Sequence, residues 1–476
     1  MASKKPIPLS KRLVIVAKES PNLQLMTTQQ FFNTLTKYLK DLGIVIPFQI
    51  ERLHDVRLNV EFSEKYANQF NELKLNDLEK LFNTAIYRNR RTTDLQKKLY
   101  RYFTIEVKEE YESKIMFEAL SYLKKIGLVV EEVWYDTILT IDLPKENPPI
   151  KSSFLLSAAA PPPCPSGWNM TNVHQIPAPT SLLPNDTLPP NRGENIVVAV
   201  LDGGILTGHS GLTGRIASSI NFTTSPSSTN AEPSINHGTE VAGIVSSSFG
   251  GVGCIAPEAQ IMNVKVADST TAYASRFAQG IHYCAQREGG QLRAQVINIS
   301  WYFPDKITSS EFGGEDQIIE AYKQGNIIVF CAGNKNKQVY GTNDNPRFLP
   351  KSAKTMCIIV GGVSCDNKLW VVTPNSSGTN LGSSITIGAP ADWLNTLNSS
   401  NMNAAINPIQ FNGTSAAAPH VSGLVAVMLS NRANLDFNQI QGLLQTYGSP
   451  LDPSVPPADF NMMNMEAVLT NLMAFP

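Results

Sequence analysis

The stretch that most constrains the fold lies near the C-terminal end of the chain, where Asn412-Gly413-Thr414-Ser415 leads into a long apolar run. No Asp, Glu, Lys or Arg occurs from residue 412 to residue 430, and Ala, Val, Leu and Met fill most positions after Ser415. A run of this kind predicts a helix that is buried on nearly every side. The rest of the chain must therefore be organised around that helix.

Ser415 is expected where a loop enters this helix. The first turn of a helix has backbone N–H groups without intrahelical partners, and these groups favour negative charge that develops on a nearby oxygen. Gly413 would let the backbone approach a bound substrate closely. Ser415 is therefore a candidate nucleophile, and the alternative is that Thr414 or Ser415 only caps a core helix.

A serine nucleophile requires a histidine that takes its proton and a carboxylate that orients the histidine. Residues 196–202, Ile-Val-Val-Ala-Val-Leu-Asp, form a β-branched run typical of a buried parallel strand, and the run ends in Asp202. The carboxyl end of such a strand is where α/β sheets place their ligands. His237 opens an apolar segment with helical spacing and is the candidate base. Taken singly, Asp202 could be a strand-end cap and His237 a satisfied core histidine.

The order of these residues and the sequences around them resemble the subtilisin-like serine proteases, or subtilases. The matching blocks are VAVLDGGI around Asp202, NHGTEVAGIV around His237, NGTSAAAPHVSG around Ser415 and VFCAGN, which ends in Asn334. The resemblance implies a doubly wound, mostly parallel α/β sheet and a serine endopeptidase that cuts protein or peptide substrates.

The same resemblance implies a role for each residue of the triad. Ser415 would attack the scissile carbonyl to form an acyl-enzyme, His237 would act as base and then as acid, and Asp202 would orient His237. Asn334, which taken alone could be a turn residue, would bind the oxyanion together with the Ser415 N–H. No metal or organic cofactor is expected.

The segment 296–302, VINISWY, matches the family segment that pairs with substrate as an extra strand and lines the first specificity pocket. The resemblance makes three residues of this segment and two of the VFCAGN block substrate-binding residues, namely Ser300, Trp301, Tyr302, Cys331 and Gly333. The family usually has a small or aliphatic residue and then glycine after the serine. Trp301 and Tyr302 are therefore predicted to reshape or narrow the pocket.

Two further positions depart from the family. Gly203 stands where Ser or Thr is common, which removes a hydrogen bond to Asp202 but leaves the triad intact. The loop 246–251, Ser-Ser-Ser-Phe-Gly-Gly, lacks the Asn and Asp oxygens of a tight calcium site, so that site is not expected. His209 and His420 belong to family blocks and are expected to be structural. Three other histidines carry no motif, namely His54, His174 and His282.

Composition and charge narrow the possible partners. The formal net charge is −1, which gives no reason to expect nucleic acid or an anionic membrane surface. The apolar run 13–17 is too short for a signal peptide, and no stretch approaches the ~18 apolar residues of a membrane span. The 6 cysteines lack zinc-site spacing, and several are expected to be reduced core thiols. A cytosolic protein, or one exported without a cleavable signal, is the simplest interpretation.

Length and an uneven charge density predict more than one domain. The chain has 476 residues, of which 42% are hydrophobic, and charged residues are denser before residue 150 than after it. We expect an N-terminal α+β domain over residues 1–145, a proline-rich linker over 146–165 and a catalytic domain over 166–476, with Trp168 packing on its core. The N-terminal domain could be a pro-domain that inhibits the active site or a retained recognition module, and both alternatives stay open.

Periodicity predicts the elements of both domains. The expected N-terminal elements are strand 13–17, helix 27–42, helix 76–88, strand 103–107, helix 109–126 and a hairpin of strands 128–133 and 137–143. The expected strands of the catalytic domain are 196–201, 260–266, 296–300, 327–332 and 357–363. Its expected helices are 237–247, 272–288, 314–324, 415–431 and a last helix 437–447.

Two other functions fit parts of the sequence. A specialised processing enzyme or a transpeptidase would use the same triad, and the bulky Trp301 and Tyr302 would fit its restricted pocket. A binding protein on a catalytically silent protease fold would have the N-terminal domain as its working part. The intact triad argues against this last function.

Overall fold

The computed structural model describes most of the chain, and the statements below refer to these residues. They are residues 11–19, 27–54, 93–136, 138–140, 168, 191–224, 227–248, 254–303, 314–341, 348–373, 377–392, 394–397, 411–452 and 459–474. The chain divides into two compact units. The first unit comprises Met1–Ile138, Tyr273–Arg293 and Ser309–Glu320, and the second comprises Leu139–Ala272, Ala294–Thr308 and Ala321–Pro476. The domain limits expected at residues 145 and 166 stay a prediction.

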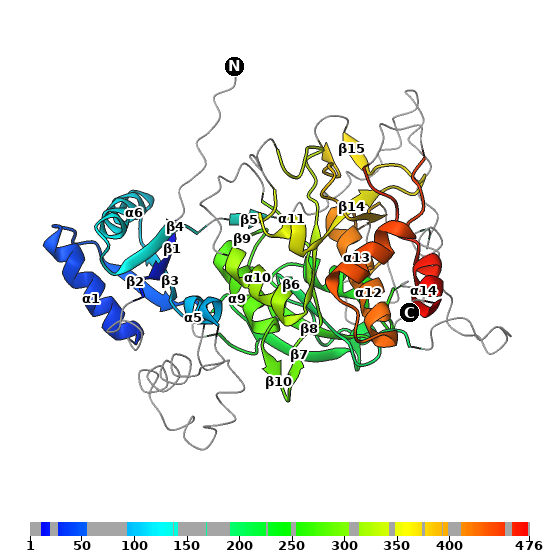
Figure 1. Cartoon of the computed structure of the whole chain (residues 1–476), viewed down its shortest axis with the longest axis horizontal. Coiled ribbons are helices and arrows are strands. Elements are labelled where there is room, and N and C mark those ends of the chain that lie inside the picture. Colours follow the sequence, from blue (N-terminus) through cyan, green and yellow to red (C-terminus); the bar gives the residue numbers. More distant parts are fainter. Residues whose placement is uncertain are drawn as a thin grey trace, which may run out of the picture. The chain divides into compact units, whose positions relative to one another are not determined.

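The first unit is built on a four-stranded antiparallel sheet in the order β2-β3-β1-β4 (Figure 1). The strands are β1 (Arg12–Ala17), β2 (Phe48–Arg52), β3 (Tyr102–Val107) and β4 (Val130–Tyr135). Helices α1 (Thr28–Asp41) and α6 (Glu110–Lys125) pack on one face, where their apolar side chains share a core with those of β1 and β3. The predicted α+β organisation of this region is confirmed.

Local sequence explains where the helices of this unit begin. Thr27 accepts a hydrogen bond from the backbone of Gln30 and the Gln30 side chain accepts one from the backbone of Thr27, so a capping box opens α1. Thr93 and Gln96 form the same box at the start of α5 (Asp94–Leu99). Each box satisfies two backbone donors that the first helical turn leaves without partners.

Four of the elements predicted for the N-terminal region are confirmed, namely strand 13–17, helix 27–42, strand 103–107 and helix 109–126. The expected hairpin is wrong, because β4 pairs with β1 while β5 (Ile138–Thr140) pairs with β9 (Thr271–Tyr273). Alternation of apolar residues indicates a strand but does not name its partner. The expected helix 76–88 lies outside the described residues.

The first unit also contains α9 (Ala274–Cys284), which follows β9 in the chain. The buried carboxylate of Asp136 accepts hydrogen bonds from the backbone N–H of Ser275, at 3.0 Å, and from its hydroxyl. Gln279 Nε2 donates to the carbonyl of Leu53 at 2.6 Å. Ala278 shares an apolar cluster with residues of β1 and β3, so α9 is part of this unit's core.

The second unit is built on a seven-stranded sheet in the order β17-β14-β13-β12-β6-β8-β7, and all its strand pairs are parallel. The strands are β6 (Val197–Asp202), β7 (Ile216–Asn221), β8 (Gln260–Lys265), β12 (Val296–Ile299), β13 (Ile327–Cys331), β14 (Ile358–Val363) and β17 (Ile387–Pro390). Strands β12, β13 and β14 are buried along their whole length and β6 and β8 at every position but the first, as expected for a parallel sheet that is covered on both faces. The predicted α/β fold class is confirmed.

The strand order reverses between β6 and β12. From β6 the chain continues to β7 and β8 on one side, and the later strands β12, β13, β14 and β17 follow on the other side. A crevice outside the carboxyl ends of the strands at such a switch point is where open α/β sheets bind ligands. The carboxyl ends of β6, β12 and β13 lead directly into Asp202, Ser300 and Asn334.

Helix α12 (Thr414–Asn431) packs on β12, β13, β14 and β17 and on α8 (His237–Val245). Every residue of α12 from Thr414 to Leu429 is buried, which confirms the helix predicted from the apolar run. The remaining described elements are the 3₁₀ turn Ser210–Leu212, β10 (Arg287–Glu288), β11 (Gln291–Leu292), α10 (Glu315–Gln324), α11 (Ala353–Met356), β15 (Val371–Thr373), β16 (Ser377–Gly378), α13 (Phe437–Thr446) and α14 (Met465–Ala474).

All five strands and all five helices expected in the catalytic region are present within a few residues of their predicted bounds. The sequence analysis missed β7 and β17, and 437–447 is not the last helix, because α14 follows it. Trp168 is buried and its Nε1 donates to the carbonyl of Asp392 at 2.8 Å, so its expected packing on this core is confirmed.

Candidate active site

Asp202 and His237 form a buried pair at the carboxyl end of β6. His237 Nδ1 lies 2.8 Å from Asp202 Oδ2, and both side chains are fully buried. The other carboxylate oxygen, Oδ1, accepts a hydrogen bond from the N–H of Gly203 at 2.7 Å. Since a carboxylate can only accept, His237 carries its proton on Nδ1, and Nε2 is then the basic nitrogen. Nε2 has no hydrogen-bond partner in the described part of the chain.

The surroundings of His237 shift its pKa in opposing directions. Burial acts to lower the pKa of His237, whereas the charge and the hydrogen bond of Asp202 and the charge of Glu240 raise it, and the net shift is upward. Glu240, which lies three residues later in α8, is itself buried, and burial raises its pKa to about 7. The sequence analysis did not select Glu240, although a charged residue within the apolar start of α8 is a signal that could have found it.

Helix α8 lies directly on the turn that follows Asp202. A Cβ atom added at Gly238 would lie 2.3 Å from the carbonyl oxygen of Gly204 and 3.1 Å from the Cβ of Asp202. Glycine at position 238 is therefore required for the close approach of α8 to the end of β6. This approach brings His237 into hydrogen-bond distance of Asp202.

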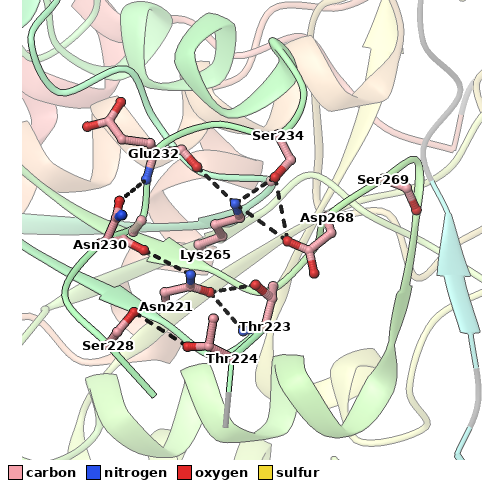
Figure 2. Close-up of polar contacts among 12 residues, drawn as sticks. Asn221, Thr223, Thr224, Ser228, Asn230, Glu232, Ser234, Lys265, Asp268 and Ser269 are labelled. Atoms are coloured by element: carbon pink, nitrogen blue, oxygen red, sulfur yellow. Dashed lines mark hydrogen bonds and ion pairs between the residues drawn. The ribbon is translucent and has the colours of Figure 1, made fainter. Parts of the chain in front are cut away.

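Lys265, the last residue of β8, holds the segment that leads into α8 (Figure 2). Its ammonium group donates to the carbonyl of Glu232 at 2.9 Å and to the hydroxyl of Ser234 at 2.6 Å, and lies 3.5 Å from the Asp268 carboxylate. The register of β6 and β8 places Lys265 opposite Asp202. Lys265 therefore binds the segment before His237 and also lies beside Asp202 in the sheet.

Ser415 and Ser300 hold each other through two hydrogen bonds. Ser415 Oγ donates to the carbonyl of Ser300 at 3.0 Å, and Ser300 Oγ donates to the carbonyl of Ser415 at 2.9 Å. The second bond compensates for Pro419, which lies inside α12 and has no N–H to offer the carbonyl four residues before it. The side chain of Ser300, expected to bind substrate, therefore supports the backbone of the candidate nucleophile.

The side chain of Asn334 is fixed with its amide nitrogen available. Asn334 Oδ1 accepts hydrogen bonds from Thr414 N at 3.0 Å and from Thr414 Oγ1 at 2.7 Å. Because the backbone N–H can only donate, the oxygen must face Thr414, and Nδ2 lies beside Gly413. Gly413 has a φ of 100°, a conformation that favours glycine. The donor Nδ2 and the N–H of Ser415 thus lie at the same end of α12.

Two aromatic rings flank His237. The rings of Trp301 and Phe411 lie 6.4 Å and 5.3 Å from the imidazole, centroid to centroid, in edge-to-face geometry. Both rings are fully buried. Phe411 was missed because nothing in its local sequence distinguishes it from a core residue, although it precedes Ser415 by only four positions.

The remaining pocket candidates lie between the ends of β12 and β13. Tyr302 and Cys331 are fully buried, and Gly333 donates its N–H to Thr414 Oγ1 at 3.0 Å. Burial raises the pKa of the Cys331 thiol to about 12, which makes it an inert neighbour of Ser415. The predicted substrate-binding residues are thus brought close to Ser415, but Trp301 and Tyr302 form part of the core.

Other polar candidates have structural partners. His420 Nδ1 lies 2.8 Å from the carbonyl of Ala416 and accordingly donates to it, and burial lowers the pKa of His420 to about 4. His209 Nδ1 accepts from the N–H of Gly211 at 2.9 Å. The rings of His54 and His282 contact each other in the first unit in a tilted arrangement, with 4.2 Å between centroids. His174 lies outside the described residues.

The sequence analysis expected no metal site, no membrane span and several reduced core cysteines. Among the described residues no group of three or more His, Cys, Asp or Glu side chains could hold a metal ion. Part of the loop 246–251 lies outside these residues, so the expectation for calcium stays a prediction. Among the described residues, Cys365 forms a disulfide, whereas four buried cysteines form none, namely Cys254, Cys284, Cys331 and Cys357. In the described part of the chain, no helix combines the length and apolarity needed to cross a membrane.

Comparisons with known proteins agree with this site. Residues 193–454 match the model of the subtilase family, Peptidase S8. The major intracellular serine protease of Bacillus subtilis (strain 168) is 30% identical over 248 residues, which are 50% of this chain and 70% of that protein. Subtilisin DY of Bacillus licheniformis is 27% identical over 266 residues, covering 55% and 87% of the two chains.

Solved structures give a weaker match. The crystal structure of a cold adapted subtilisin-like serine proteinase has a TM-score of 0.49 and 21% identity, and the match covers 63% of this chain and 97% of that chain. The match to the family model includes the sequences around Asp202, His237, Asn334 and Ser415. The chain belongs to the subtilase family and is a subtilisin-like serine endopeptidase.

Proposed function

We propose that this enzyme hydrolyses peptide bonds through Ser415, His237 and Asp202. Ser415 Oγ attacks the scissile carbonyl carbon, and its proton passes to Nε2 of His237. The tetrahedral oxyanion accepts hydrogen bonds from Asn334 Nδ2 and from the backbone N–H of Ser415. His237 then donates its proton to the leaving amine, and water attacks the acyl-enzyme by the same route in reverse.

The observation that carries this proposal is the 2.8 Å contact between His237 Nδ1 and Asp202 Oδ2 in a fully buried pair. This contact fixes the tautomer in which Nε2 can accept a proton. Nε2 has no partner among the described residues, so it is available to the serine. The charge of Asp202 also stabilises the imidazolium that forms after proton transfer.

One conformational step separates this arrangement from attack. Ser415 Oγ donates to the carbonyl of Ser300 at 3.0 Å, so its hydrogen is directed away from His237. Rotation about the Cα–Cβ bond of Ser415 would redirect the hydroxyl while the backbone stays held by Ser300 Oγ. Apo geometry of this kind is compatible with catalysis, because catalytic hydrogen bonds often form only with substrate present.

We further propose that residues 1–145 regulate the enzyme to which they belong, as an inhibitory pro-domain or as a retained recognition module. Support comes from the first compact unit, which includes α9 although α9 falls within the region that matches the family model. Asp136 binds the first turn of α9 through Ser275, an interaction that satisfies a backbone N–H group at the start of the helix.

Two alternative functions differ in their use of the triad. A specialised processing enzyme or a transpeptidase would use the same triad, and a catalytically silent binding protein would not use it.

The compartment stays a prediction. Disulfides are typical of oxidising compartments. The disulfide of Cys365 therefore favours export over the cytosol of the two alternatives expected from sequence. The exclusion of nucleic acid as a partner rests on the net charge of −1 alone.

Intact-mass spectrometry with a small fluorophosphonate probe tests the proposal. Wild type should gain the mass of one adduct, and both Ser415→Ala and His237→Ala should gain none. Ser430→Ala, at the far end of α12, is the matched control and should be labelled like wild type. Loss of the N-terminal mass only when Ser415 is present would identify a pro-domain, and labelling without cleavage would identify a retained module. Absence of labelling in wild type would favour the silent binding protein or an enzyme that its N-terminal domain still inhibits.

A further inference from the structure

The space beside Ser415 is bounded by two chain segments that separate at the edge of the sheet. The pairing of β12 with β13 ends at Ile299 and Phe330, and the segments 300–302 and 331–334 continue beyond it. The first segment contacts Ser415 through Ser300, and the second contacts Thr414 through Asn334. Both segments therefore flank the carbonyl carbon that Ser415 would attack.

The positions of Asn334 and His237 determine where the residue before the scissile bond must lie in a bound substrate. Its carbonyl oxygen must point to Asn334 Nδ2, and its leaving amine must lie near His237. The residue that precedes the scissile bond must then lie along the segment 300–302, and its side chain must enter the space between that segment and 331–334. This is the position of the first specificity pocket in the family that the chain belongs to.

Tyr302 occupies this space. Its side chain is fully buried, and a Cβ added at Gly333 would lie 2.9 Å from Tyr302 Cδ2 and 3.0 Å from Cγ. The ring therefore packs directly on the backbone of Gly333, across the gap between the two segments. Lys335 Nζ lies 5.8 Å from the ring centroid, within the range of a cation–π contact.

Gly333 is held in the conformation that permits this contact. Its φ is 95°, and Asn380 also packs against Gly333, because Asn380 Nδ2 would lie 2.7 Å from the added Cβ. Asn380 Nδ2 also donates to the carbonyl of Ala332 at 2.8 Å. The wall that faces Tyr302 is therefore hydrogen-bonded and close-packed, and it cannot retreat without loss of these contacts.

We propose that the Tyr302 ring fills the first specificity pocket and restricts the enzyme to peptides with glycine immediately before the scissile bond. This inference rests on the proposed function, since it assumes attack by Ser415. Glycine has no side chain to place in the occupied space, whereas Phe or Leu would have to displace the ring. Members of the family usually have glycine at the position of Tyr302, which leaves the pocket open for a substrate side chain. In this enzyme the side chain of Tyr302 takes the place of that substrate side chain.

The test compares fluorogenic peptides that differ only in having Gly, Ala, Leu or Phe before the scissile bond. Wild-type enzyme should favour Gly over Phe by about 100-fold or more in kcat/KM, the range that one large apolar group can provide. Tyr302→Gly should shift the Phe-to-Gly ratio by about 100-fold in favour of Phe, because the Phe side chain then fills the vacated space. Tyr302→Ala should give a smaller shift in the same direction.

The neighbouring residue provides a matched control. Phe303, the next residue along the chain, is also a fully buried aromatic residue, and its N–H donates to the carbonyl of Phe348 at 2.9 Å. Phe303→Ala should lower stability without any gain in cleavage of the Phe peptide. Rates are normalised to the fraction of Ser415 that the fluorophosphonate labels, so partly folded variants remain comparable.

The outcomes separate this inference from the proposed function. Failure of the probe to label wild type would count against the proposed function itself. Labelled wild type that cleaves the Phe peptide as fast as the Gly peptide, or that cleaves no Gly peptide, would overturn the role of Tyr302. Unchanged preference in Tyr302→Gly and Tyr302→Ala, with normal labelling, would overturn it as well.

Discussion

Glu240 provides a quantitative test of the electrostatics around His237. It lies one helical turn after His237 and is 4% exposed. Burial raises the pKa of Glu240 from its ordinary value of 4.5 to about 7; repulsion from Asp202 acts in the same direction, and attraction to His237 acts against it. The native state therefore holds this proton across a pH range in which an unfolded glutamate would have lost it.

The sign and size of the effect on stability follow by linkage. Between pH 4.5 and about 7 the native state binds more protons at this site than the unfolded state, so the free energy of unfolding falls as pH rises. At about 1.4 kcal/mol per pKa unit, the loss from this group is on the order of 3 kcal/mol. Glu240→Gln keeps the shape but cannot ionise. The unfolding free energy of the variant relative to wild type should therefore rise by that amount from pH 4 to pH 8.5.

The assay is urea denaturation followed by circular dichroism at several pH values. Both proteins carry Ser415→Ala, which prevents autolysis. Glu194→Gln, at an exposed glutamate in the same unit, is measured in parallel as the control for the Glu-to-Gln change itself. A Glu240→Gln difference that varies with pH no more than that of the control would refute the assignment of a buried, proton-binding carboxyl.

The same substitution should change catalysis. Glu240 carries its negative charge only above its pKa of about 7, and there the charge helps to raise the pKa of His237, so its removal lowers the pKa of His237. The acid limb of kcat/KM for Glu240→Gln, with Ser415 intact, should move to lower pH, because His237 must be neutral to accept a proton. A limb that stays in place or moves to higher pH would contradict the contribution of Glu240.

Three other substitutions test the remaining parts of the site. Asn334→Ala should lower kcat by roughly two to three powers of ten with little change in KM, measured on the Gly peptide, because it removes one oxyanion donor; an unchanged kcat would exclude Nδ2 from that role. Gly238→Ala should abolish activity and lower the melting temperature, since the new Cβ would lie 2.3 Å from the Gly204 carbonyl oxygen; full activity would contradict the close approach of α8. Ser300→Ala should destabilise by about 1–3 kcal/mol in thermal unfolding, because it orphans the buried Ser415 carbonyl; Ser300→Thr should restore part of the loss.

The residues of the triad could be predicted because they interrupt patterns that are otherwise apolar. Asp202 ends a buried β-branched run, and the structure has it at the last position of β6. His237 and Ser415 begin helices whose following residues are almost wholly buried. A polar residue at the boundary of a buried element has few structural reasons to be there, so its position in the sequence already indicates a site.

Strands β7 and β17 could not be predicted, for two different physical reasons. β7 (Ile216–Asn221) lies at one edge of the sheet with two exposed residues, so its sequence IASSIN lacks an apolar pattern. β17 (Ile387–Pro390) lies at the other edge and contains Gly and Pro, which are typical of turns. β7 joins the sheet by pairing with β8, and β17 joins it by pairing with β14. The sequence predicts both of these partner strands, but it does not show that they have a further neighbour.

The sequence also could not predict the directions in which the side chains of Trp301 and Tyr302 point. Trp301 and Tyr302 were expected to narrow the specificity pocket, which depends only on their size. Whether each ring points into the pocket, into the core or into solvent depends on what β13 and α12 place opposite it. Gly333 leaves room for the ring of Tyr302, and the indole of Trp301 lies edge-to-face with the imidazole of His237, the first residue of α8. Specificity therefore depends on pairs of residues that are distant in sequence.

Pro419 and Ser300 link a feature that is visible in the sequence to a contact that only the structure shows. Proline at position 419 reveals from sequence alone that the carbonyl of Ser415 lacks its helical hydrogen bond, because the missing N–H is four residues ahead. It does not reveal which group takes its place. The structure supplies Ser300 Oγ, which itself accepts a hydrogen bond from Asn298 Nδ2 at 3.0 Å, and Asn298 Oδ1 accepts one from Ser422 of the same helix at 2.9 Å. The proline thus exchanges one bond within α12 for a network that ties the first turn of the helix to β12. Because β12 also carries the segment along which substrate must lie, the nucleophile and its substrate are positioned by the same strand.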